Sequence, residues 1–278
     1  MAYVRPGSGG LDYQLCRYGA SRLLVRGPRQ RLVPPYTVFF GGSETFGRFV
    51  PRPFPDLLSE AVGLSCVNMG CINAGVDVFA DDPALVAAAA RADTTVIQIL
   101  GAQNLSNRFY TVHPRRNDRF IGATPELAAL YPEVDFTEFN FTRHLLTTLE
   151  RTCPDRFAAV IDALQRRWMA QMTALIDRCG ARTILLWIGS SEPPQEARQI
   201  AAAPDPLFVD VAMMAALAAR ADDLVTVVPS AAARAAGTRG MVFDEIEAPV
   251  AAETAGPAVH AEIADALSPV LAAHRDAA

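Results

Sequence analysis

The chain has 278 residues, of which 51% are hydrophobic and 20% are charged. This balance supports a large buried core and argues against a disordered chain. The net charge of −5 also argues against a nucleic-acid-binding protein.

The first residues, MAYVRPGSGG, lack the apolar stretch of a secretory signal, and no run of about 18 apolar residues follows them. We therefore expect a cytoplasmic protein without a membrane span. The cysteines show no pair with metal-ligand spacing, so we expect reduced, structural thiols and no metal. They are Cys16, Cys66, Cys71, Cys153 and Cys179.

Every cationic side chain is an arginine, and these arginines are unevenly distributed. Residues 1–120 carry 13 arginines against 9 acidic residues, whereas the rest of the chain is strongly acidic. The cationic half either meets an anionic ligand or pairs with the acidic half.

Residues 1–35 precede the first predicted strand, and we expect them to form an N-terminal extension packed on the core. Five later segments are continuous apolar runs rich in β-branched residues, as is typical of buried parallel strands. They are YTVFF (36–40), LSCVN (64–68), TTVIQIL (94–100), TILLWIG (183–189) and LVTVV (224–228).

Helical patterns separate these runs. The segment 53–63 opens with proline and closes with glycine, which is the usual asymmetry of helix ends. The clearest helix spans 154–179, where apolar residues recur at spacings of three, four and seven. Further helices are predicted at 81–92, 205–221 and 256–274, and part of 135–150 also has a helical pattern.

The alternation of strands and helices predicts an α/β fold with a doubly wound, five-stranded parallel sheet in three α/β/α layers. One domain then covers 36–278, with an insert at about 105–153 that is rich in arginine, aromatic residues and asparagine. Long inserts in compact domains are usually functional.

Ligands of open parallel sheets bind outside the carboxyl ends of the strands. Glycines, hydroxyls, amides and a histidine follow the predicted strands here. The segments are GGSETFG (41–47), NMGCINAGVD (68–77), GAQNLSNRFY (101–110), GSSEPP (189–194) and, further on, GPAVH (256–260).

These segments resemble, in order, the sequence blocks of the SGNH (GDSL-type) hydrolases. GGSETFG is similar to G-D-S-x-x-x-G, NMGCINAG to N-x-G-x-x-G, GAQN to G-x-N-D, and GPAVHAEIADAL to the histidine block. The resemblance implies a flavodoxin-like fold over most of 36–273. The extension and the insert lie outside it and resemble a divergent bacterial subgroup of unknown function.

On this resemblance Ser43 is the nucleophile and His260 its base, since a serine hydroxyl needs an adjacent base. Glu253, Asp244 and Glu247 are candidates to orient the imidazole. The oxyanion donors would come from Asn73, Gly75, Gln103 and Asn104. In a second register of the histidine block, the catalytic position falls on Thr254, and the enzyme lacks its base.

Each of these residues also has a structural interpretation. Ser43 can cap the segment that follows it. His260 can be a helix residue that faces water, and the asparagines can satisfy the backbone of turns. Arg108, Arg115 and Arg116 either bind a carboxylate, sulfate or phosphate or belong to a surface loop that pairs with the acidic half.

The first hypothesis is therefore serine-dependent ester hydrolysis or acyl transfer on a small or glycan-linked substrate, anionic substrates among them. The alternative is an inactive SGNH-like protein that binds an anionic small molecule through the arginines of the first half. A nucleotide or flavin protein ranks last, because the chain has no P-loop lysine and no G-x-G-x-x-G after a strand. We expect no cofactor, and the sequence leaves the oligomeric state open.

Overall fold

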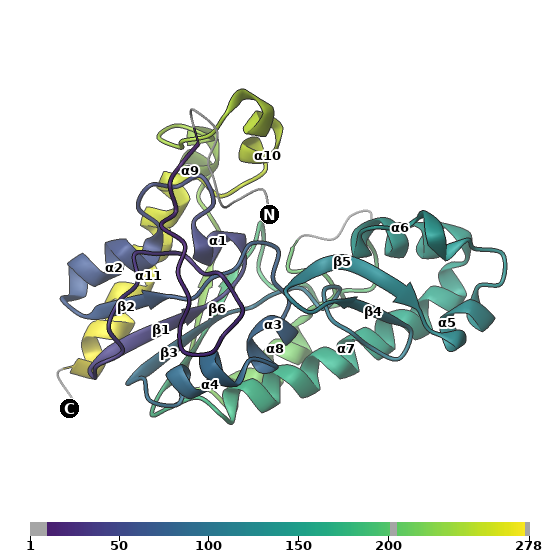
Figure 1. Ribbon diagram of the computed structural model, residues 1–278, viewed down its shortest axis with the longest axis horizontal. Coiled ribbons are helices and arrows are strands. Elements are labelled where there is room, and N and C mark those ends of the chain that lie inside the picture. Colours follow the sequence, from purple (N-terminus) through teal and green to yellow (C-terminus); the bar gives the residue numbers. More distant parts are fainter. Residues whose placement is uncertain (1–9, 201–204, 276–278) are drawn as a thin grey trace.

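The computed structural model describes residues 10–200 and 205–275. At its centre is a five-stranded parallel sheet in the order β2-β1-β3-β6-β7 (Figure 1). Val38 of β1, for example, lies opposite Val67 of β2 and Thr95 of β3. The predicted strands are confirmed with small changes at their ends. They are β1 (Tyr36–Phe40), β2 (Ser65–Asn68), β3 (Thr94–Gln98), β6 (Thr183–Ile188) and β7 (Asp223–Val227).

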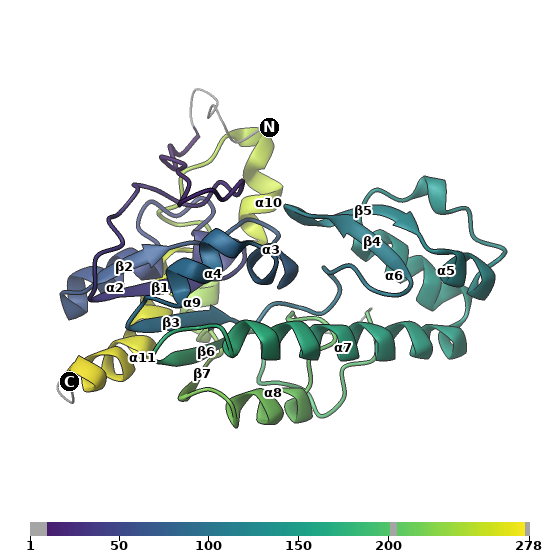
Figure 2. The same cartoon turned by 60° about the horizontal axis from the view of Figure 1, so that its bottom comes forward.

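Helices cover both faces of this sheet, as the α/β prediction requires (Figure 2). One face packs against α2 (Phe54–Val62), α9 (Ala231–Ala236) and α11 (Pro257–Arg275) through an apolar cluster that includes Leu58 and Leu267. The opposite face packs against the helices that follow β2, β3 and β6. They are α3 (Asp77–Ala80), α4 (Pro83–Ala89), α7 (Pro154–Ile176) and α8 (Val211–Ala218).

The insert is an antiparallel hairpin with helices, where the sequence indicated a long segment with some helix. The hairpin consists of β4 (Tyr110–His113) and β5 (Arg116–Ala123). It projects beside the sheet and lies over the far part of α7 (Figures 1 and 2). The rest of the insert is α5 (Pro125–Leu130), the 3₁₀ turn η1 (Phe136–Glu138) and α6 (Thr142–Thr152). Several of its aromatic residues, Phe120 and Phe139 among them, are buried in the same apolar cluster as one face of the sheet, whereas Phe141 is exposed.

Several predicted helices start later or are shorter than their patterns. Asp82 caps α4 by accepting hydrogen bonds from the backbone N–H groups of Ala84 and Leu85, so the helix begins at Pro83. Asp210 caps α8 in the same way, so that helix does not extend back to residue 205. The remaining short elements are α1 (Ser43–Phe46), η2 (Glu245–Glu247) and α10 (Ala248–Ala252).

The N-terminal segment 10–35 forms no helix, yet it carries buried side chains. Leu23 and Val25 belong to the main apolar cluster. The buried Arg26 guanidinium donates to the carbonyl oxygens of Gly47 (2.9 Å), Val50 (3.0 Å) and Pro51 (2.9 Å). The segment therefore fixes the loop that follows α1.

Candidate functional site

Ser43 is the first residue of α1, directly after β1, at the point where the strand order reverses between β1 and β3. In open parallel sheets this is the crevice where ligands bind. The backbone at Gly41 packs closely against the side chains of Thr45 and Gln98. A Cβ at this position would lie 2.0 Å from Thr45 Oγ1 and 2.4 Å from Gln98 Oε1. The turn that presents Ser43 thus depends on this glycine.

Gln98, the last residue of β3, holds this turn in place. Its Oε1 accepts hydrogen bonds from the N–H of Gly42 (2.9 Å) and the hydroxyl of Thr45 (2.7 Å). Its Nε2 donates to Glu44 Oε2 (2.8 Å). The sequence interpretation treated Gln98 only as part of a strand, and its polar side chain at the end of an apolar run was the signal that it missed.

The loop after β2 brings Asn73 to Ser43. Asn68 anchors the loop, because its Oδ1 accepts from Gly70 N–H (2.9 Å) and its Nδ2 donates to the Thr45 carbonyl (2.7 Å). Asn73 has a left-handed backbone (φ 55°), which asparagine tolerates better than most residues. Its backbone N–H lies 3.3 Å from Ser43 Oγ, and the Ser43 hydroxyl lies 3.4 Å from Asn73 Oδ1.

Asp118 of β5 joins the site from the insert. Its Oδ2 accepts a hydrogen bond from Asn73 Nδ2 at 3.1 Å. Its Oδ1 is shielded from solvent and has no hydrogen-bond partner within residues 10–200 and 205–275. Ser43, Asn73 and Asp118 therefore form one hydrogen-bonded chain, which we call the Ser43 chain. The sequence interpretation missed Asp118 because it lies among the arginines of HPRRNDR.

The other predicted oxyanion donors form no hydrogen bond with Ser43 in the described part of the chain. Gly75 donates its N–H to Asn117 Oδ1 (3.1 Å) and lies against the backbone of Asn104. The side-chain oxygen of Asn104 accepts from the Thr142 hydroxyl (2.7 Å). The backbone carbonyl of Gln103 accepts a hydrogen bond from the Tyr110 hydroxyl (2.6 Å). The side-chain Oε1 of Gln103 is buried without a partner among the described residues.

His260 does not form a dyad with Ser43. The imidazole is fully buried between α11 and α2, where it stacks on Phe54, and its Nδ1 accepts the Phe54 N–H at 3.1 Å. No hydrogen bond between His260 and Ser43 exists in the described structure. Burial lowers the pKa of His260 to about 4, and the charge of Arg26 acts in the same direction.

The expectation that His260 faces water is also wrong, since none of its surface is exposed. Two of the three proposed orienting acids are engaged in local structure instead. Asp244 and Glu247 form a capping box at η2, and Glu253 ends α10. Thr254 donates its hydroxyl to the Val250 carbonyl at 2.7 Å.

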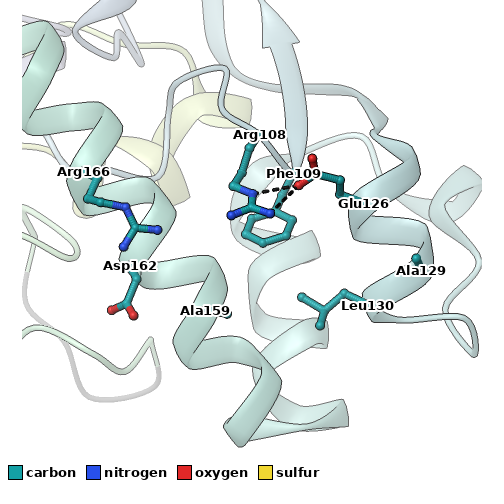
Figure 3. A pocket seen from close by; sticks show the side chains of 8 residues that line it. All are labelled: Arg108, Phe109, Glu126, Ala129, Leu130, Ala159, Asp162 and Arg166. Atoms are coloured by element: carbon teal, nitrogen blue, oxygen red, sulfur yellow. Dashed lines mark hydrogen bonds and ion pairs between the residues drawn. The ribbon is translucent and has the colours of Figure 1, made fainter.

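The three arginines proposed to bind an anion lie in different surroundings. Arg108 is neutralised by Glu126, with its guanidinium 2.7 Å from the carboxylate, and lies across the Phe109 ring. Figure 3 shows this pair on one side of a cavity of about 530 Å³, with Asp162 and Arg166 of α7 on the other side.

Arg115 lines a second cavity, which is described below. Burial raises the pKa of the Cys71 thiol to about 12, Asp118 adds to this rise, and Arg116 opposes it. Cys71 is therefore a protonated, unreactive neighbour of the Ser43 chain at neutral pH.

Residues 10–200 and 205–275 offer neither a metal site nor a membrane span. This part of the chain has no cluster of three or more histidine, cysteine, aspartate or glutamate side chains that could hold a metal ion. It also has no helix that is both long and apolar enough to cross a bilayer.

A family model described as a domain of unknown function, DUF6473, matches residues 1–275. The chain belongs to the DUF6473 family. Comparisons with curated proteins and with solved structures gave no match. The DUF6473 range includes the N-terminal segment and the hairpin insert as well as the sheet. Asp118 and Arg26, which come from those added parts, thus lie within the family's own domain.

Proposed function

We propose that this DUF6473 protein is an SGNH-like, flavodoxin-like serine esterase or acyltransferase with Ser43 as its nucleophile. The observation that carries the proposal is the contact of 3.3 Å between the Asn73 backbone N–H and Ser43 Oγ at the switch point of the sheet. A donor beside the nucleophile is what the oxyanion of an acyl-transfer intermediate needs.

The geometry of this contact suits a donor that is available to substrate. A distance of 3.3 Å is long for an N–H to hydroxyl hydrogen bond, so the Asn73 amide loses little by turning to a developing oxyanion. The backbone N–H of Ser43 itself is a second donor in the proposal. Ser43 is partly exposed and Asn73 is exposed, so an ester carbonyl has access to both residues.

The proton acceptor in this proposal is Asp118, because His260 is sealed in the core. Asp118 is one side chain away from Ser43, because its Oδ2 accepts a hydrogen bond from Asn73 Nδ2. A bridging water would complete the path, as is common for a general base that does not contact the nucleophile directly. Ser43 would then attack the ester carbonyl, the C–O bond to the alcohol would break, and the alcohol would leave with the proton taken from Ser43. Water or an acceptor hydroxyl would then release the acyl group from Ser43.

Hydrolysis of small aryl esters tests the proposal. We expect Ser43→Ala to lower kcat/KM by on the order of 10³-fold, because the nucleophile is lost while the fold is kept. Ser191→Ala is the matched control, since Ser191 is an exposed serine in the loop after β6 and its hydroxyl donates only to the Glu192 carbonyl. Equal activity of Ser43→Ala and wild type would contradict the proposal.

A binding role without turnover is the second candidate, and the isolation of His260 from Ser43 favours it. A serine without an adjacent base is a weak nucleophile. In that case the wild-type protein would show no ester hydrolysis above the buffer rate, and Ser43→Ala would change only ligand affinity.

A further inference from the structure

A second cavity, of about 630 Å³, lies between the N-terminal segment, α3, α4, α7 and the hairpin tip. We call it the hairpin cavity. It shares no residue with the Ser43 chain. Its volume falls in the usual range of small-molecule pockets. Its charged and polar lining consists of Arg22, Asp77, Asp81, Asp82, Ser106, Arg115, Asn117 and Arg167.

The acidic side chains of the hairpin cavity are largely occupied by the fold. Asp77 is 6% exposed and accepts hydrogen bonds from Gln171 Nε2 (2.7 Å) and the Ser106 N–H (3.0 Å). Asp82 accepts from the Ser21 hydroxyl (2.6 Å) while it caps α4. Asp81 is the most open of the three and accepts from Gln171 Nε2 at 3.3 Å.

The arginines of the cavity have fewer hydrogen bonds and ion pairs to the rest of the protein than the aspartates have. Arg22 and Arg115 are exposed, and within the described ranges neither side chain has an ion pair or a hydrogen bond. Arg167 is partly engaged, because its Nε donates to the Ser106 carbonyl at 3.3 Å and its Nη2 lies 3.8 Å from Asp77 Oδ1. The donors that the cavity can still offer to a ligand are therefore guanidinium groups, which match the geometry of oxyanions.

The hairpin tip that carries Arg115 is held in place by a buried side chain. Asn117 has no exposed surface, and its Nδ2 donates to the His113 carbonyl at 3.1 Å. Its Oδ1 accepts the N–H of Gly75 at 3.1 Å, which ties the tip to the loop after β2. Arg115 is thus mounted on a fixed turn, and it lines the hairpin cavity together with Arg22 of the N-terminal segment.

We propose that the hairpin cavity binds a small molecule through a phosphate, sulfate or carboxylate group, which Arg22 and Arg115 hold together. Asp81, at the open acidic side, accepts hydrogen bonds from hydroxyl groups of the same molecule. The site does not depend on catalysis at Ser43, so Ser43→Ala leaves this binding unchanged.

Calorimetric titration of the full chain with inorganic phosphate, inorganic sulfate, glucose 6-phosphate and glucuronate tests the proposal. We expect at least one probe to bind at millimolar or lower concentration, and its identity distinguishes the three oxyanions. Arg22→Gln and Arg115→Gln should each weaken that binding about tenfold or more, because each removes a charged hydrogen-bond donor. Arg151→Gln, at the exposed end of α6, should bind like wild type.

The proposal would be overturned if none of the four probes binds. Unchanged affinity for the probe in Arg22→Gln and Arg115→Gln would also overturn it. An equal loss of affinity in Arg151→Gln would overturn it as well, because the probe would then be attracted by the overall charge of the protein. Because Arg22 and Arg115 are exposed, we expect both variants to fold, and thermal melts that match wild type check this.

Discussion

The imidazole of His260 lies in the apolar layer between α2 and α11, where its surroundings favour the neutral form. Burial is the main reason that the pKa of His260 falls to about 4. The Arg26 charge lowers it further, and the carbonyl of Ala255 acts in the opposite direction. Nδ1, without a proton, accepts the Phe54 N–H at the start of α2. This histidine therefore links two helices.

This burial predicts a pH-dependent stability. The folded pKa of His260 lies below its ordinary value of about 6.5, so the unfolded chain binds this proton more tightly. The stabilisation is complete above about pH 6.5 and is lost as the pH falls toward 4, by about 2 kcal/mol at pH 5. Denaturant unfolding at several pH values should show this loss for wild type.

His260→Asn is the matched variant, because its amide oxygen can still accept the Phe54 N–H but does not titrate. The variant should have a lower free energy of unfolding than wild type at neutral pH. As the pH falls, it should not show the further loss of stability that protonation of His260 causes in wild type. The same pH dependence in both proteins would contradict the neutral, buried imidazole.

Asp118 carries the second prediction at the residue scale. In our account its carboxylate accepts the Ser43 proton and holds Asn73 through the bond of 3.1 Å. Asp118→Asn keeps the size of the side chain but removes the base, so kcat for ester hydrolysis should fall about 10²-fold or more with little change in KM. Asp162→Asn, on the exposed side of α7, is the control. If Asp118→Asn lowers the stability of the protein but leaves kcat unchanged, Asp118 has only a structural role.

The sequence carried part of this information at the residue scale. Ser43 and Asn73 each follow a strand in a recognisable block, so their proximity followed from the topology. His260 also gave a signal that was not used: it shares helical spacing with Ile263, Leu267 and Leu271, the buried stripe of α11. Asp118 was not predictable, because its contact with Asn73 requires the insert to fold back over the rim.

The loop after α1 depends on a side chain from the N-terminal segment. Arg26 is 5% exposed, and its guanidinium satisfies carbonyls of the segment 46–51 that no helix or strand uses. Burial lowers its pKa from the ordinary value, but the fork of donors remains charged at neutral pH. The interaction fixes the element that begins with Ser43.

Arg26→Lys tests this dependence. An ammonium group cannot reach these carbonyls in the same planar arrangement, so buried acceptors lose their partners. We expect the free energy of unfolding to fall by about 2–4 kcal/mol. Arg31→Lys, an exposed change in the same segment, should alter it by less than about 0.5 kcal/mol. Equal stability of Arg26→Lys and wild type would show that the carbonyls are satisfied otherwise.

Elements with strong apolar patterns were predictable, and elements defined by pairing were not. The strands β1, β2, β3 and β6 are largely apolar because both of their faces are mostly buried, whereas the edge strand β7 is partly exposed. The strand β5, RNDRFIGA, is largely polar, and it forms because β4 pairs with it. The sequence of β5, taken alone, therefore resembles that of a loop.

At the scale of the whole molecule, α7 connects the sheet to the insert. This helix has 23 residues, which gives a length of about 35 Å. The Trp168 indole donates to the Leu100 carbonyl at 2.8 Å, which ties the helix to the end of β3. The apolar cluster on this face of the sheet continues along α7 into the insert, where it includes Phe120 and Leu145.

This arrangement explains why the hairpin reaches the rim of the sheet. The insert packs on the far part of α7. Its strand β5 runs from the side of the sheet toward α5, so the turn between β4 and β5 lies near the sheet (Figure 1). Asp118 consequently meets Asn73, and Arg115 reaches the hairpin cavity. Both candidate sites are therefore built partly from the insert.

In the proposed mechanism Ser43 is the nucleophile. The most direct test of this role is mass-spectrometric mapping of the protein after reaction with a fluorophosphonate. We predict one adduct, on the peptide that contains Ser43, which Ser191→Ala and His260→Asn retain and Ser43→Ala lacks. The absence of an adduct on wild type, or an adduct that persists in Ser43→Ala, would contradict the account.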